Sequence, residues 1–168
     1  DRFSLYAGIE VFSLLIGIAE GDFIGPGMVL RPHFSIPVKQ DKLTFGCGLI
    51  AGGIVGTGEG TFGLAPYGSI ALGNTDRYVN VNFGVGIGDE GVSPPFFSIN
   101  GNLRLTPGFG LNMENWIFPG RFETAIANSI GVRLYGERIS WNIALVGVGS
   151  DFGYYLLPIP LGGLTVSF

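Results

Sequence analysis

The stretch RYVNVNFGVGIG, Arg77–Gly88, alternates strictly along most of its length. From Val79 onward every second residue is valine, phenylalanine or isoleucine, and the residues between them are only asparagine and glycine. A period of two is typical of a β-strand with one apolar face. The pattern leaves open which face points inward, because a soluble sheet buries its apolar face whereas a barrel in lipid exposes it.

The composition favours the barrel in lipid. Only 13% of the 168 residues are charged although 46% are apolar, and a soluble domain usually carries about 25% charged residues. The 30 glycines and 10 prolines disfavour helices, because they cost roughly 1 and 3 kcal/mol in a helix interior. The longest apolar run, VFSLLIGIAEG at 11–21, is too short for a spanning helix of about 20 residues. We therefore expect one all-β domain, residues 1–168.

Several other kinds of site have no signal in the sequence. The net charge is −4 and no stripe of Lys or Arg occurs, which argues against nucleic acid as a partner. The single cysteine, Cys47, cannot form an intramolecular disulfide, and its alternation with Phe45 and Leu49 predicts a small outward residue. One histidine and scattered carboxylates provide no metal-ligand spacing. We therefore expect neither a metal nor a cofactor.

Turn signals divide the chain at nearly even intervals. They leave ten runs of ten or more residues, at 3–19, 22–38, 43–56, 61–73, 77–88, 96–105, 109–118, 121–136, 138–149 and 153–168. A tilted strand needs about 9–11 residues to cross a bilayer. The sequence thus predicts an antiparallel up-and-down transmembrane β-barrel of ten strands. Eight strands is the alternative, because Gly and Pro interrupt the first two runs. An even number places both termini at one end.

The charges that fall within the runs lie on the polar face. Three acids and three bases occur there, joined by the only histidine: Glu10, Glu114, Glu123, Arg31, Arg104, Arg133 and His33. Charges withdrawn from bulk water must pair, so this balanced set predicts a charge network inside the barrel, with the apolar face outside. The network could line a narrow channel or form a salt-bridged plug. Because barrels of about eight strands are filled by their side chains, we favour the plug.

Two asparagines break the apolar face on neighbouring runs, Asn115 and Asn128. A polar group that faces lipid is costly near the middle of a membrane and less so near the interface. The two residues are therefore either part of the membrane rim or a stripe that faces another protein.

The chain ends in GGLTVSF, in which Leu164, Val166 and Phe168 alternate and the last residue is aromatic. This ending resembles the C-terminal strand signature of bacterial outer-membrane β-barrel proteins, although Pro158 and Pro160 interrupt the strand before it. The resemblance implies a Gram-negative outer membrane with both termini periplasmic. It also implies insertion by the barrel-assembly machinery and contact with outer-membrane lipid and lipopolysaccharide. It implies no particular activity.

Three functions agree with these features. The first is a structural or accessory subunit of a larger outer-membrane complex, which the short turns and the outward asparagines favour. The second is a narrow, porin-like channel for ions or small solutes through a lumen lined by Arg, Glu and Asn. An enzyme at the barrel rim has the least support, because a general base needs an orienting partner and none is evident for His33. We expect that the chain is not an enzyme.

Overall fold

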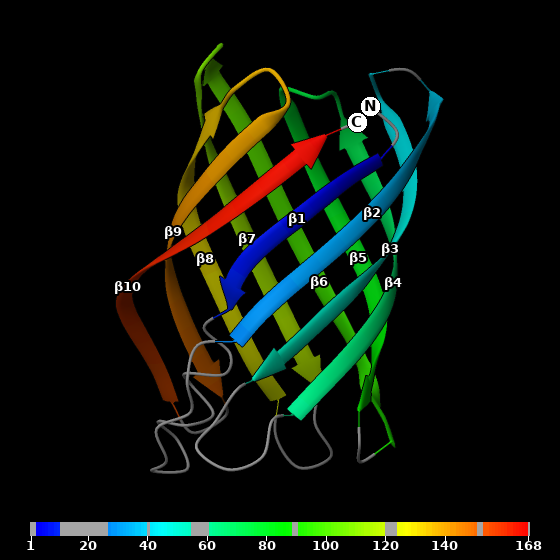
Figure 1. Ribbon diagram of the computed structural model, residues 1–168, viewed down its shortest axis with the longest axis vertical. Coiled ribbons are helices and arrows are strands. Elements are labelled where there is room, and N and C mark those ends of the chain that lie inside the picture. The colour runs from blue at the N-terminus through cyan, green and yellow to red at the C-terminus, as the bar shows by residue number, and fades with distance from the viewer. Residues whose placement is uncertain are drawn as a thin grey trace.

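The computed structural model describes residues 3–10, 27–39, 41–54, 61–88, 91–119, 124–150 and 153–167. These residues form a closed antiparallel barrel in which each strand pairs with its neighbours in sequence and β1 also pairs with β10 (Figure 1). Its strands are β1 (Phe3–Glu10), β2 (Gly27–Lys39), β3 (Leu43–Ile54), β4 (Thr61–Gly73), β5 (Arg77–Gly88), β6 (Gly91–Thr106), β7 (Phe109–Pro119), β8 (Thr124–Tyr135), β9 (Ile139–Ser150) and β10 (Gly153–Ser167). Within the described part of the chain, no helical segment has the length and apolar character that a membrane crossing requires.

The predicted ten-strand, up-and-down architecture is confirmed, and one predicted boundary is wrong. The turn predicted between the runs 77–88 and 96–105 is shorter than expected, because β6 already begins at Gly91. The ladder continues because a register shift between β5 and β6 accommodates the Ser-Pro-Pro segment. There the Ser93 hydroxyl accepts a hydrogen bond from the Gly86 N–H at 2.8 Å, so a side chain replaces a backbone partner. The rest of the first predicted run, 11–19, lies outside the described residues.

The apolar face of each strand points outward. On β5, Val79 and Val81 are 51% and 45% exposed, whereas Asn82 between Val81 and Phe83 is only 3% exposed. Among the described residues, seven polar side chains are buried: Ser69, Asn82, Ser98, Asn100, Asn102, Asn112 and Asn142. The described interior is therefore largely polar, with apolar residues such as Phe96 and Val146 in part of it, and the exterior is apolar, the reverse of a soluble sheet.

Both ends of the chain lie at one end of the barrel, as the even strand count predicts (Figure 1). Tight turns join the strands there. In the turn between β4 and β5, the Asn74 side-chain oxygen accepts hydrogen bonds from the backbone N–H groups of Asp76 and Arg77, at 3.0 and 2.9 Å. Gly73 precedes this turn with a φ of 119°, a conformation that favours glycine.

Rings on one strand cover glycines on the next strand inside the barrel. A Cβ atom added at Gly163 of β10 would clash with the Tyr6 ring of β1. The same close approach recurs around the barrel, between Tyr67 and Gly48, Phe96 and Gly84, and Tyr135 and Gly110. Several inward glycines thus make room for aromatic rings, which in turn fill the space that the missing side chains leave.

The Gly73→Ala variant is expected to lose roughly 1–3 kcal/mol of unfolding free energy. The added Cβ atom would clash with the Arg77 carbonyl oxygen, and alanine disfavours the positive φ. Denaturant unfolding of the folded barrel in detergent micelles measures the loss. Gly108→Ala is the matched control in another turn at the same end, because its added Cβ atom meets nothing within 4 Å. Equal losses in the two variants would contradict the explanation.

Candidate functional site: the lumen and the outward asparagines

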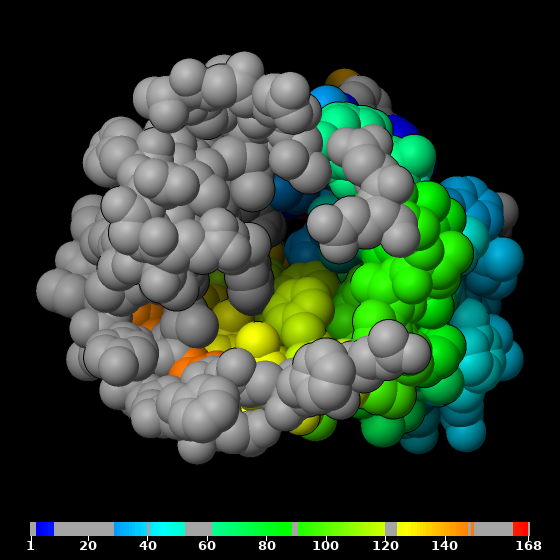
Figure 2. All heavy atoms as spheres, turned by 90° about the horizontal axis from the view of Figure 1, so that it is seen from below, coloured from blue at the N-terminus to red at the C-terminus, as the bar shows by residue number. Residues whose placement is uncertain are grey.

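The inward side chains change in character along the barrel axis. Arg104, Arg133, Tyr78 and Tyr135 lie toward the end with the termini, and asparagines and serines follow in the middle. Apolar side chains lie toward the opposite end: Phe96, Trp116, Phe118, Ala127 and Val146. Figure 2, viewed from that opposite end, shows a hollow that leads into the barrel, with side chains of the yellow-green strand β7 visible inside it. The lumen is therefore visible from one end, and the chemical character of its lining changes along the barrel axis.

An ion pair crosses the lumen at mid-depth. Arg31 on β2 and Glu114 on β7 approach to 3.9 Å between Nη2 and Oε1. These strands stand five positions apart in a ring of ten, so the side chains reach toward each other from opposite walls. The Trp116 indole N–H donates to the Glu114 carboxylate at 3.3 Å, and the Arg31 guanidinium lies 5.1 Å from the centre of the Tyr6 ring. Side chains that cross the lumen in this way favour a plug over an open pore.

A layer of amides lines the wall made by β5, β6 and β7. Asn82 donates to the Ser98 hydroxyl at 2.7 Å, Asn80 donates to the Asn82 oxygen at 3.0 Å, and Asn100 donates to Ser98 at 3.4 Å. Four buried amide atoms have no partner among the described residues: Oδ1 of Asn80, Asn100 and Asn112, and Nδ2 of Asn142. Buried polar atoms of this kind are where water or a small polar solute binds in a protein interior.

The other two arginines of the predicted network make separate contacts near the termini. Arg104 pairs with Asp76 in the β4–β5 turn, at 3.3 Å between Nη1 and Oδ1, and its guanidinium lies 4.4 Å from the centre of the Tyr135 ring. Arg133 donates to the Asn142 side chain and, at 3.4 Å, to the Tyr78 hydroxyl. Among the described residues, the charges thus form separate clusters instead of one network.

Three members of the predicted sets cannot be placed. Glu10 ends β1, where its backbone pairs with Gly27, and the structure does not describe its side chain. Glu123 and Phe168 lie outside the described residues. Asp76 and Tyr78 were not predicted to take part in these contacts. Asp76 belongs to a turn, so its contact with Arg104 depends on how that turn folds back over the barrel end.

His33 has an aromatic partner. Its Nδ1 atom lies 3.1 Å from the Tyr67 hydroxyl, and the two rings stack with centroids 5.8 Å apart. Gly46 on β3 lies beneath the imidazole, and an added Cβ atom there would meet it. Among the described residues, no group of three or more His, Cys, Asp or Glu side chains lies close enough to hold a metal ion. His33 therefore packs against Tyr67 and over Gly46 at the wall of the lumen.

Asn115 and Asn128 stand directly opposite each other across β7 and β8. Met113 and Ile117 flank Asn115 on the outward face, Ile126 and Ile130 flank Asn128, and all four are exposed. The pair therefore lies in the middle of the apolar face and not at its rim. Asn115 donates to the Ile99 carbonyl oxygen of β6 at 3.2 Å. The side-chain amide of Asn128 makes no hydrogen bond with another described residue. Its neighbour on β9 is Gly147, which has no side chain that could bond to it.

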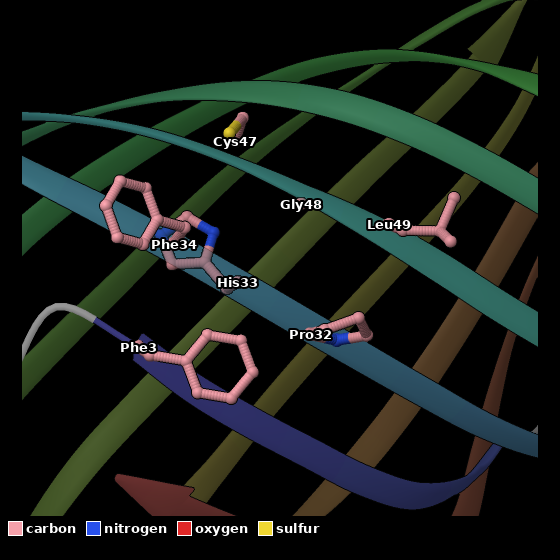
Figure 3. Close-up of a pocket in the computed structure, with 7 residues that line it drawn as sticks. All are labelled: Phe3, Pro32, His33, Phe34, Cys47, Gly48 and Leu49. Carbon is pink, nitrogen blue, oxygen red and sulfur yellow. The ribbon is translucent and has the colours of Figure 1, made fainter. Parts of the chain in front are cut away.

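An outward pocket lies on the other side of the barrel, on strands β1, β2 and β3. Phe3 and Phe34 face each other on adjacent strands, and Cys47 of β3 is exposed beside them (Figure 3). Pro32 and Leu49 also line the pocket. The pocket is shallow and mostly apolar, and His33 and the Cys47 thiol are also among its lining residues.

A double-mutant cycle on Arg31→Met and Glu114→Gln is expected to give a coupling free energy of about 1–3 kcal/mol. The same cycle on Arg104→Met and Asp76→Asn is expected to give less than about 0.5 kcal/mol. The second contact is shorter, but its side chains are more exposed, at 33% and 54% against 23% and 28%. Unfolding in detergent micelles measures both. A larger coupling for Arg104 and Asp76 would show that distance, and not burial, decides the strength.

Comparison with known proteins finds no matching family model, no similar curated protein and no similar solved structure.

Proposed function

We propose that the chain is an integral barrel of a Gram-negative outer membrane. The exterior supports this, because each of the consecutive strands β1–β9 carries at least one large exposed apolar side chain. Among the described residues, outward charges occur only at strand ends, as at Lys39 and Arg77. A closed barrel also pairs its backbone groups internally, which a bilayer requires. In this arrangement Leu164 and Val166 face lipid beside Trp141 and Ile139, and both termini are periplasmic.

The role we propose within that membrane is that of a structural or accessory subunit of a larger complex. One observation carries this proposal: the Asn115–Asn128 pair lies at mid-strand among exposed Met and Ile side chains. An amide without a hydrogen bond in an apolar environment costs on the order of 1–3 kcal/mol. A partner that supplies the missing hydrogen bond removes this cost. The ion pair that crosses the lumen agrees, because its side chains occupy part of the path that a solute would take.

The two tryptophans test the membrane assignment. Trp141 is exposed on the outside, whereas Trp116 is inside and donates a hydrogen bond to Glu114. In vesicles of lipid with brominated acyl chains, the Trp116→Phe variant, which keeps Trp141, is expected to show strong fluorescence quenching. The Trp141→Phe variant, which keeps Trp116, is expected to show little. Quenching of Trp116 alone would mean that the faces are reversed.

The subunit role predicts that the chain, extracted gently from its own membrane, has a native mass well above that of one 17.8 kDa barrel. The Asn115→Leu, Asn128→Leu double variant is expected to lose that association while it still folds, because leucine suits a lipid-facing position. Mass measurement with identification of co-purifying chains provides the readout, and Ile36→Leu, on β2 across the barrel, is the control. A single barrel as the native species would overturn the subunit role.

A narrow channel is the second candidate, favoured by the unpartnered amide atoms in the lumen and by the partial exposure of Arg31 and Glu114. Planar-bilayer recording separates it from the subunit role. We expect no steady conductance from the native barrel. Steady conductance whose ion selectivity changes in Glu114→Gln or Arg31→Met would instead establish the channel.

A further inference from the structure

We propose that the Asn115–Asn128 pair is a self-association site, at which a second copy of this chain packs through its own β7–β8 face. This inference rests on the proposed subunit role and names the partner for the same surface. It is carried by the position of the pair, by its unused hydrogen-bonding groups and by the absence of charge around it.

The amides are complementary to a copy of themselves. Asn115 already uses its N–H₂ group on the Ile99 carbonyl, and its Oδ1 atom accepts no hydrogen bond from another described residue. Neither the side-chain N–H₂ group nor the Oδ1 atom of Asn128 bonds to another described residue, so both can bond to a partner. The Asn128 amide of one copy can therefore donate to Asn115 Oδ1 of the other. A two-fold axis repeats the same bond in the opposite sense.

Insertion in the membrane places the asparagine pairs of two copies at the same depth. Copies inserted in the same direction are related by a two-fold axis along the membrane normal, so each residue lies at the same depth in both. A polar pair at mid-strand therefore faces the same polar pair in its copy. An unrelated partner would have to present an amide at that depth independently.

The surroundings permit close contact between two such faces. The outward residues of β7 and β8 include no charged side chain among those described, so two copies do not repel each other. Ile130, at 67% exposure, and Met113 lie beside the amides. They can pack against their counterparts around the hydrogen-bonded centre.

Thiol cross-linking of the chain refolded alone in phospholipid vesicles tests the proposal. The reporter variant is Ile130→Cys with Cys47→Ala, which leaves both asparagines in place and puts a thiol next to Asn128. The native chain is the matched control, because its exposed Cys47 lies on β3, five strands away from β8 and thus on the opposite side of the barrel. A short bifunctional thiol reagent is applied at a low ratio of protein to lipid.

We expect a cross-linked dimer from the reporter variant and none from the native chain. Adding Asn115→Leu and Asn128→Leu to the reporter is expected to weaken dimerisation roughly tenfold, the effect of losing two weak hydrogen bonds in a membrane. Ile126→Cys, on the other side of Asn128, replaces Ile130→Cys if that variant does not fold.

Three results would overturn self-association: no dimer, equal dimer from Cys47, or dimer that persists without the asparagines. Each leaves the subunit role open, because a large native complex that contains other chains would still support it. A single barrel as the native species in its own membrane would overturn both.

Discussion

Tyr6 lies at the seam where the sheet closes, with its ring over Gly8 of its own strand and Gly163 of β10. Among the described residues, the pairing at this seam joins Ser4–Gly8 of β1 to Gly163–Ser167 of β10. Without it, both strands would present unpaired backbone groups at an open edge. Closure also separates the two faces of the sheet. One face becomes the lumen and the other becomes the exterior.

The same side chain has opposite consequences on the two sides of this wall. Inside, Asn82 finds Ser98 and a second asparagine, so a row of amides becomes a connected layer. Outside, Asn128 stands among isoleucines and has only glycine beside it on β9. Because the strand pattern has a period of two, a single position decides which of these environments a residue enters. Asn128 is for this reason more informative about association than the buried asparagines.

Much of the fold could be predicted because strand alternation is local. The ten strands, the inward position of Arg31 and Glu114 and the outward position of Asn115 follow from residues two apart in the chain. Which residues meet could not be predicted in the same way. That Asn115 faces Asn128 depends on the register between β7 and β8, and that Arg31 meets Glu114 depends on barrel size and stagger. The early start of β6 was missed because Pro94 and Pro95 signal a turn, although a bulge accommodates them.

The contact between Arg31 and Glu114 has a consequence for the order of folding. In an open, flat sheet, β2 and β7 would be separated by five strand spacings of about 4.8 Å, or about 24 Å in all, beyond the reach of any two side chains. Hairpins and larger open sheets can form without this ion pair, and both groups stay hydrated in them. The pair becomes possible only once the sheet has curled enough to bring β2 and β7 face to face. It therefore rewards curvature of the sheet and contributes nothing to the flat hairpins that precede it.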